Sequence, residues 1–312
     1  MGAEAARGGV LGLDDETCAA MLPARRPDGH KGTHGTLVCL AGSRQYAGAA
    51  LLAATAAARG GAGLVALAVP ESVVPLVAGR LLEAVTLVLP EAGGDVEPDG
   101  AWARLRARRA DAYLLGCGLN ESEGNRRLVL DLLRQPGPDP DGGALPALVP
   151  AVVDGGALNL LSRSGEWWRD VRRPCVLTPH PGEFARLRGR PPATTDEERR
   201  DQAREAAAAF RQVVVLKGAR TVIAASDGRT AVAPFANPAL GSAGTGDVLA
   251  GLIGALLAQG VAPFEAACLG VYLHGRAGEA IRGRLGEAGL LASDLPYEIA
   301  LARGQLGRRR DA

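Results

Sequence analysis

From Asn237 to Leu257 the chain reads NPALGSAGTGDVLAGLIGALL. Proline and glycine break any regular element in the first half, whereas the apolar residues of the second half recur with helical spacing. A glycine-rich loop that opens a helix presents free backbone N–H groups, and the helix dipole attracts anions to that end. Small residues also let a phosphate approach the backbone closely. The stretch therefore predicts a phosphate-binding helix N-terminus.

One carboxylate, Asp247, lies at the start of this helix. An acid beside phosphate-binding amides suits the deprotonation of a hydroxyl that attacks a phosphoryl group. The alternative is an ordinary first-turn acid that caps the helix. Lys217, which follows another predicted strand, would meet phosphate as a point charge, and its alternative is a solvated lysine in a turn.

Composition narrows the class of protein. The 312 residues carry a net charge of +1 and only 4% aromatic residues, which argues against nucleic-acid binding and an anionic membrane surface. The five cysteines are scattered, as expected for reduced core thiols rather than disulfides or a zinc site. No signal peptide opens the chain, and no apolar run is long enough to span a bilayer. We expect a soluble, cytoplasmic enzyme.

Strand and helix patterns alternate along most of the chain. Strands are predicted at 36–41, 64–69, 85–89, 112–115, 148–153, 175–178 and 213–216, and helices at 49–58, 102–109, 127–133 and 195–210. A hairpin at 221–233 and helices near 247–258, 263–281 and 293–306 complete the chain. This order predicts an α/β fold with a mostly parallel sheet between helices. We expect one domain at 30–307, a lead-in at 1–29 with a short helix, a surface loop at 135–146 and a solvated basic tail at 308–312.

Unusual residues follow the predicted strands, where ligands bind in open parallel sheets. No P-loop motif occurs, and Glu121 stands where the dinucleotide fingerprint after Gly116 needs glycine. His180 lies between two prolines that fix its direction, so it either contacts a ligand or braces its loop. His30 and His34 lack the pattern of a helical zinc motif, and we expect no metal ligands among the side chains.

Several segments together resemble the NAD(P)H-hydrate dehydratase family, which has the ribokinase-like fold. The GTGD loop is shared by the whole ribokinase-like superfamily, whereas TPHPGE combined with KGAxT is much narrower. The resemblance covers His30 to about Tyr297. Its segments are His30–Gly35 (HKGTHG), Ala41–Ser43 (AGS), Gly48–Ala50 (GAA), Arg59–Val65 (RGGAGLV), Ala157–Asn159 (ALN), Thr178–Glu183 (TPHPGE), Leu216–Ala219 (LKGA) with Thr221, and Gly244–Gly251 (GTGDVLAG).

The resemblance implies a three-layer sandwich and an enzyme that repairs NADH and NADPH hydrated on the nicotinamide ring (NADHX and NADPHX). ADP, or ATP, with Mg²⁺ would phosphorylate the hydrate, and loss of phosphate would restore the cofactor. Asp247 would be the catalytic base. By motif position, the hydrate would contact Ala49, Gly118, His180 and Asp247, and the adenine nucleotide would contact Lys217, Gly218, Ala219, Arg220, Thr221 and Gly246.

The resemblance further implies a homo-oligomer, a tetramer, that works with a separate NAD(P)H-hydrate epimerase. Two other functions stay open: a kinase of the same fold that acts on a vitamin-precursor alcohol, and a non-catalytic regulator that binds adenine nucleotide. Four residues depart from the family pattern and leave substrate affinity and any magnesium arrangement open. They are Gly156 in place of an acid, Cys117 and Asn120 in place of proline and glycine, and Ala243 before Gly244.

Overall fold

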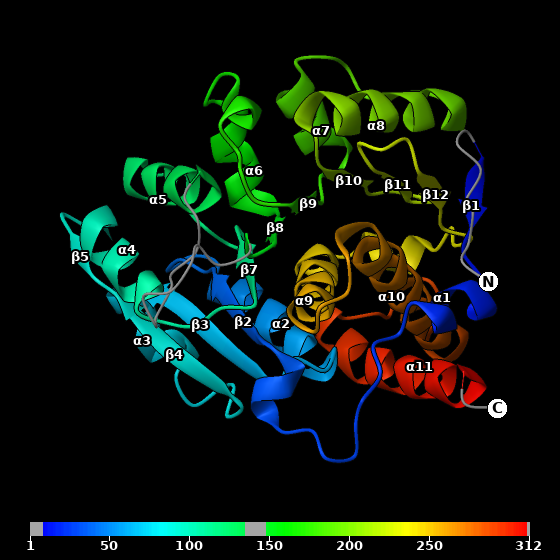
Figure 1. Ribbon diagram of the computed structural model, residues 1–312, viewed down its shortest axis with the longest axis horizontal. Coiled ribbons are helices and arrows are strands. Elements are labelled where there is room, and N and C mark those ends of the chain that lie inside the picture. The colour runs from blue at the N-terminus through cyan, green and yellow to red at the C-terminus, as the bar shows by residue number, and fades with distance from the viewer. Residues whose placement is uncertain (1–8, 135–147, 311–312) are drawn as a thin grey trace.

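The computed structural model describes residues 9–134 and 148–310 (Figure 1). Within them, a ten-stranded sheet has the order β1-β12-β11-β10-β9-β8-β7-β2-β3-β4. Every neighbouring pair is parallel except those of β11, which is antiparallel to β10 and β12. The strands are β1 (Val10–Gly12), β2 (Thr36–Leu40), β3 (Leu64–Pro70), β4 (Ala84–Leu89), β7 (Ala112–Leu115), β8 (Ala151–Val153), β9 (Cys175–Leu177), β10 (Val213–Leu216), β11 (Val222–Ala224) and β12 (Thr230–Val232).

Helices cover both faces of this sheet, because alternate side chains of its strands enter two separate cores. In β2, Leu37 and Cys39 belong to one core, and Val38 and Leu40 to the other. The first core is covered by α1 (Asp15–Ala20), α2 (Ala47–Arg59), α3 (Val74–Val77), α9 (Thr245–Ala258), α10 (Pro263–Leu285) and α11 (Leu295–Arg310). The second is covered by α4 (Pro98–Arg106), α5 (Glu123–Arg134), α6 (Gly155–Ser162), α7 (Pro181–Arg188) and α8 (Asp196–Phe210). The predicted three-layer arrangement is confirmed.

The strand order reverses between β7 and β2, and this is where open parallel sheets bind ligands. Backbone hydrogen bonds join the loops that leave these strands: the Gly42 N–H donates to the Cys117 carbonyl at 2.8 Å. The Asp154 N–H donates to Leu115 at 2.9 Å, which adds the end of β8 to the same row. The polar residues that follow the strands are thus held at one edge of the sheet.

Several elements differ from the sequence expectation. The sequence pattern predicts neither α6 nor α7, because glycines open the first helix and a proline opens the second. The lead-in contributes an edge strand, β1, which pairs with β12 and is too short to recognise from its pattern. Helix α11 runs through Arg310, and Arg309 pairs with Asp15 of α1 at 2.6 Å, although we expected 308–312 to be a solvated tail. The surface loop expected at 135–146 lies outside the described residues.

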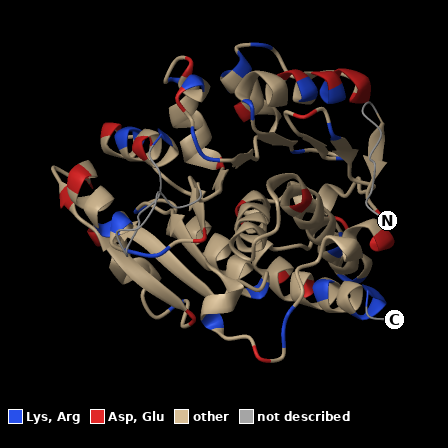
Figure 2. Ribbon diagram, viewed as in Figure 1, with Lys and Arg blue, Asp and Glu red and all other residues tan. Residues whose placement is uncertain are grey.

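Strands β5 (Glu91–Ala92) and β6 (Asp95–Val96) form a small antiparallel pair apart from the main sheet. Figure 2 shows charges of both signs along α8 and almost none along α2 and α9.

Among residues 9–134 and 148–310, no helix combines the length and apolar character needed to cross a bilayer.

Helix α9 is buried on nearly every side, and glycine allows its close approach to α2. A Cβ added at Gly251 would lie 2.1 Å from the Ala53 carbonyl oxygen. The helices therefore pack backbone to backbone at this point. Any side chain there would force them apart and tilt the start of α9.

We predict that Gly251→Ala destabilises the protein by about 2 kcal/mol, the usual scale for overpacking a core. Gly283→Ala is the matched control, because Gly283 lies in helix α10 and an added Cβ meets nothing within 4 Å. The control should be neutral or stabilising by about 0.5 kcal/mol. Urea denaturation measures both, and equal stabilities for the two variants would contradict the close approach.

Candidate active site

The first turn of α9 presents two backbone donors. Gly244 precedes the helix with a left-handed φ of 88°, and the Thr245 hydroxyl donates to the carbonyls of Leu240 (2.7 Å) and Ser242 (2.9 Å). The N–H groups of Gly246 and Asp247 have no acceptor among the residues that the structure describes. This geometry confirms the predicted helix start and leaves two donors for an anion.

His274, a residue that the sequence analysis did not single out, supports this turn from α10. Its Nε2 lies 3.0 Å from the Thr245 carbonyl oxygen, and burial lowers its pKa to about 4. The ring is therefore neutral at physiological pH and donates from Nε2 to the carbonyl. Nothing in the sequence distinguishes His274 from a core residue, because its neighbours in α10 are apolar.

Lys217 is neither a solvated turn residue nor a free point charge. Its Nζ lies 2.8 Å from Asp154 Oδ1 and 3.8 Å from Glu183 Oε2. Burial alone would lower the pKa of Lys217, but these carboxylates outweigh it and hold the pKa above its usual value. A Cβ at Gly246 would lie 3.1 Å from this Nζ, so the ammonium also borders the first turn of α9.

Asp154 is the N-cap residue of α6, but its side chain forms no capping hydrogen bond with that helix. Its Oδ1 accepts instead from the Thr178 hydroxyl at 2.6 Å and from Lys217. Its Oδ2 lies 3.8 Å from Cys117 Sγ. Asp154 thus links the loops after β7, β9 and β10.

Asp247, in contrast to Asp154, forms no ion pair with a lysine or arginine among the residues that the structure describes. Burial and then the charge of Asp154 raise its pKa to about 6, against the opposing effects of the Cys117 thiol and Lys217. A carboxyl group with a pKa near neutrality is suited to accept and release a proton at physiological pH. The position and the pKa both favour a base rather than a simple helix cap.

Three side chains of ligand type meet here: single polar atoms of Cys117, Asp154 and Asp247 all lie within 4.8 Å of one another. Mg²⁺ requires hard oxygen ligands, and a thiol is a poor ligand for it. Lys217 already neutralises Asp154. This cluster therefore does not fit magnesium held by protein side chains alone.

His180 caps helix α7 rather than lying in a loop. Its Nδ1 accepts from the N–H groups of Gly182 (3.0 Å) and Glu183 (3.4 Å), and the Glu183 carboxylate accepts from the His180 N–H at 2.8 Å. The side chain is 52% exposed and lines the neighbouring pocket. The structure thus shows the bracing role, with Nε2 3.7 Å from Glu183 Oε1, and contact of His180 with a ligand stays a prediction.

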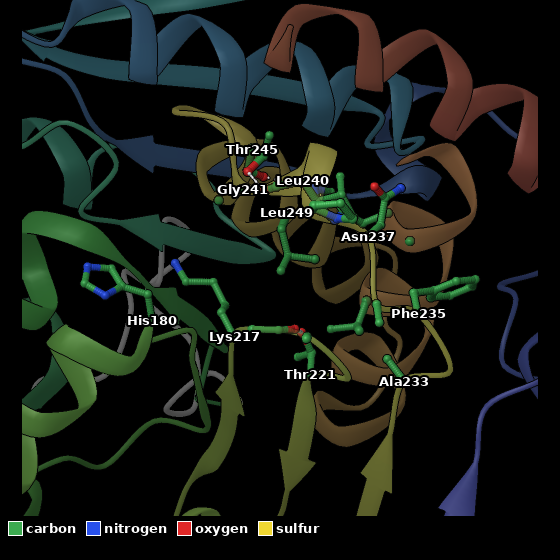
Figure 3. A pocket seen from close by; sticks show the side chains of 18 of the residues that line it. His180, Lys217, Thr221, Ala233, Phe235, Asn237, Leu240, Gly241, Thr245 and Leu249 are labelled. Atoms are coloured by element: carbon green, nitrogen blue, oxygen red, sulfur yellow. Dashed lines mark hydrogen bonds between the residues drawn. The ribbon is translucent and has the colours of Figure 1, made fainter. Parts of the chain in front are cut away.

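A pocket of about 620 Å³ adjoins the first turn of α9 (Figure 3). His180 and Lys217 lie at one end of it, and Phe235 and Asn237 lie at the other. The predicted residues that line it are His180, Lys217, Gly218, Ala219, Thr221 and Gly246.

Four predicted residues lie outside the lining of this pocket: Ala49, Gly118, Arg220 and Asp247. The guanidinium of Arg220 pairs with Asp196 at 3.3 Å on the surface. Ala49 and Gly118 adjoin each other, since a Cβ at Gly118 would lie 2.9 Å from that of Ala49. They lie beside Cys117, on the side of the cluster formed by the loop after β7.

The departures from the family pattern have local explanations. A Cβ at Gly156 would lie 2.3 Å from the Leu119 carbonyl oxygen, so the loop after β7 occupies the space of a side chain. Ala243 is exposed and has no positive φ, so it does not require glycine. Asn120 accepts a hydrogen bond from the Asn125 amide.

Comparisons with known proteins agree with this geometry. A family model described as NAD(P)H-hydrate dehydratase matches residues 37–300. The chain is 41% identical to the bifunctional NAD(P)H-hydrate repair enzyme Nnr of Moorella thermoacetica, over 90% of this chain and 52% of that protein. It is 38% identical to the ADP-dependent (S)-NAD(P)H-hydrate dehydratase of Neisseria meningitidis, over 88% of this chain and 87% of that protein. The chain thus spans about half the length of the bifunctional relatives.

Solved structures show the same similarity. The ADP/ATP-dependent NAD(P)H-hydrate dehydratase from Bacillus subtilis, co-crystallised with ATP/Mg²⁺, has a TM-score of 0.76 and 34% identity, covering 95% of this chain and 97% of that one. A ribokinase-like superfamily protein from Enterococcus faecalis has a TM-score of 0.78 at 24% identity, covering 95% and 96%. The second shows the fold alone and confirms the predicted ribokinase-like architecture.

We predict that Ala and Asn substitutions of His180 differ in their effect on the free energy of unfolding, because Asn supplies a capping oxygen and Ala does not. His180→Ala should lower the free energy of unfolding by about 1 kcal/mol, and His180→Asn should stay near the parent protein. Thermal and urea denaturation measure both variants. If Asn is as destabilising as Ala, the ring is held by contacts other than the cap.

Proposed function

Because the chain belongs to the NAD(P)H-hydrate dehydratase family, we propose that it dehydrates NADHX and NADPHX at the expense of ADP. The products are NADH or NADPH, AMP and phosphate. The observation that carries this proposal is the position of Asp247, a carboxyl group with a pKa of about 6, next to two N–H groups without acceptors. A base and an anion site in contact suit attack by a hydroxyl on a phosphoryl group.

The reaction takes place in two steps. Asp247 accepts the proton of the hydrate's hydroxyl while its oxygen attacks the terminal phosphorus of ADP, and AMP leaves. The ring–oxygen bond then breaks, the neighbouring ring carbon loses a proton, and the ring double bond of the reduced nicotinamide is restored. The hydroxyl oxygen leaves in the phosphate, so the sum is hydrate plus ADP giving cofactor, AMP and phosphate. The N–H groups of Gly246 and Asp247 stabilise the transferred phosphoryl group.

The nucleotide occupies the pocket of about 620 Å³, a volume typical of a small-molecule site. The backbone of Lys217–Thr221 forms one wall of the pocket. Apolar side chains such as Phe235 and Leu249 lie at its far end and would contact the adenine ring. Arg220 contributes through its backbone, since its side chain pairs with Asp196. Lys217 acts through the charge that it places beside the first turn of α9.

The hydrate approaches from the opposite side of Asp247, where Ala49 and Gly118 adjoin each other, and contacts the half-exposed side chain of His180. Because Lys217 compensates Asp154 and Glu183, Mg²⁺ would be held by the phosphates of the nucleotide rather than by these carboxylates. It would supply positive charge to the phosphates.

We extend the proposal to the setting of this activity. The domain at 30–307 acts in the cytoplasm as a homotetramer, and a separate epimerase interconverts the two forms of the hydrate. A kinase for a vitamin-precursor alcohol and a non-catalytic nucleotide-binding regulator are the competing functions.

We predict that purified protein with NADHX and ADP regains the near-ultraviolet absorbance of reduced nicotinamide and releases an equal amount of phosphate. ATP and nucleotide-free reactions run in parallel give the nucleotide preference. A stable phosphorylated product without phosphate release would identify a kinase. Nucleotide binding in a thermal-shift series, without any turnover, would identify the regulator.

A further inference from the structure

We propose that Arg199 of α8 is a positioning residue, which holds the backbone of Lys217–Thr221 in the conformation that binds the adenine nucleotide. The inference rests on the proposed function only in assigning the pocket of about 620 Å³ to the nucleotide. Arg199 lies outside the lining of that pocket, and its side chain is 14% exposed. It therefore acts on the nucleotide through the loop rather than by contact.

The guanidinium of Arg199 binds three backbone carbonyl groups at and after the end of β10. Its Nη1 donates to the Ala219 carbonyl at 2.6 Å, which is the shortest of the three contacts. Its Nη2 makes longer contacts with the carbonyls of Leu216 (3.5 Å) and Lys217 (3.4 Å). Asp196, in the first turn of α8, lies 3.6 Å from Nη1 and steadies the guanidinium. A planar fork of donors can reach several acceptors at once, so one side chain orients three peptide groups.

The carbonyl groups that Arg199 binds determine where the N–H groups of the same peptides point. No peptide bond among the described residues is cis, so each carbonyl points away from the N–H of the residue that follows it. In two of the three peptides this N–H already has an acceptor. The Lys217 N–H donates to the Pro179 carbonyl at 2.9 Å, and the Arg220 N–H donates to the Phe235 carbonyl at 2.8 Å.

The third peptide supplies a donor for the nucleotide. Its carbonyl belongs to Lys217, and its N–H, that of Gly218, has no acceptor among the residues that the structure describes. The next peptide is oriented in the same way by the Thr221 hydroxyl, which donates to the Gly218 carbonyl at 3.0 Å and leaves the Ala219 N–H without a described acceptor. Both residues with an unused N–H line the pocket. The loop thus offers two adjacent donors to a ligand that carries phosphate and ribose oxygens.

Glycine at position 218 lets the guanidinium pack against the backbone of the loop. A Cβ there would lie 2.7 Å from Nη2 of Arg199, and the φ of Gly218 is 143°. Without Arg199, the three carbonyls lose their donor and the loop can adopt other conformations, so a smaller fraction of molecules is ready to bind. The apparent dissociation constant of the nucleotide rises by the inverse of that fraction.

The test is the affinity of the full-length protein for ADP, measured by titration calorimetry with Mg²⁺ present. Arg199→Ala should weaken ADP binding on the order of tenfold, which corresponds to about one lost hydrogen bond from a charged group. Arg199→Lys keeps the charge but not the fork, and should weaken binding to a similar extent. Arg204→Ala is the matched control and should bind ADP as the parent protein does. Arg204 forms the same type of pair in α8, with Asp201 at 3.5 Å, but contacts the Thr230 hydroxyl instead of the loop.

Turnover gives a second measurement that a general loss of stability would not reproduce. In the dehydration assay, the KM for ADP should rise in both Arg199 variants, while kcat at saturating ADP and the KM for the hydrate stay near the values of the parent protein. ADP affinity in Arg199→Lys equal to that of the parent would overturn the proposal, because charge alone would then suffice. An equal loss of affinity in Arg204→Ala would overturn it as well. Calorimetry needs no turnover, so a parent protein that binds ADP without dehydrating the hydrate would refute the proposed function and still decide the role of Arg199.

Discussion

The packing of α9 against α2 fixes the position of the first turn of α9 and of Asp247 at the centre of the proposed site. Gly251 brings the helix axis close enough to contact the Ala53 backbone, and apolar side chains anchor the rest of α9 in the core. The first turn is therefore held rigidly at the edge of the sheet where the strand order reverses. Preorganised donors of this kind stabilise charge without having to reorient during a reaction.

An imbalance of charge gives this rigid turn its chemistry. Asp154 and Glu183 both pair with the ammonium of Lys217, which lies closer to Asp154. Asp247 is left as the acid with a raised pKa of about 6, close to neutrality.

The sequence predicted the parallel sheet, the hairpin and the helix N-terminus, because each depends on local pattern. It also placed Lys217 after a strand and His180 between two prolines, and the topology brings both to the same edge of the sheet. It did not predict that Lys217 binds Asp154, since these residues are 63 positions apart and no local pattern records the pairing. His274 was missed for a related reason, because a buried polar side chain looks like core until its neighbours are known. Cys117 was noted only as a departure from the family pattern. Helix α7 was missed because Pro181, which reads as a break, is also the favoured first residue of a helix.

The most direct test of the role of Asp247 is single-turnover phosphate release by Asp247→Asn, measured beside nucleotide affinity. Asn keeps the size of the side chain and cannot accept the proton. If Asp247 is the base, phosphate release falls by about a hundredfold or more, while nucleotide affinity holds or rises because a negative charge near the phosphates is removed. Release at a rate close to that of the parent protein would contradict the catalytic role and return Asp247 to a helix cap.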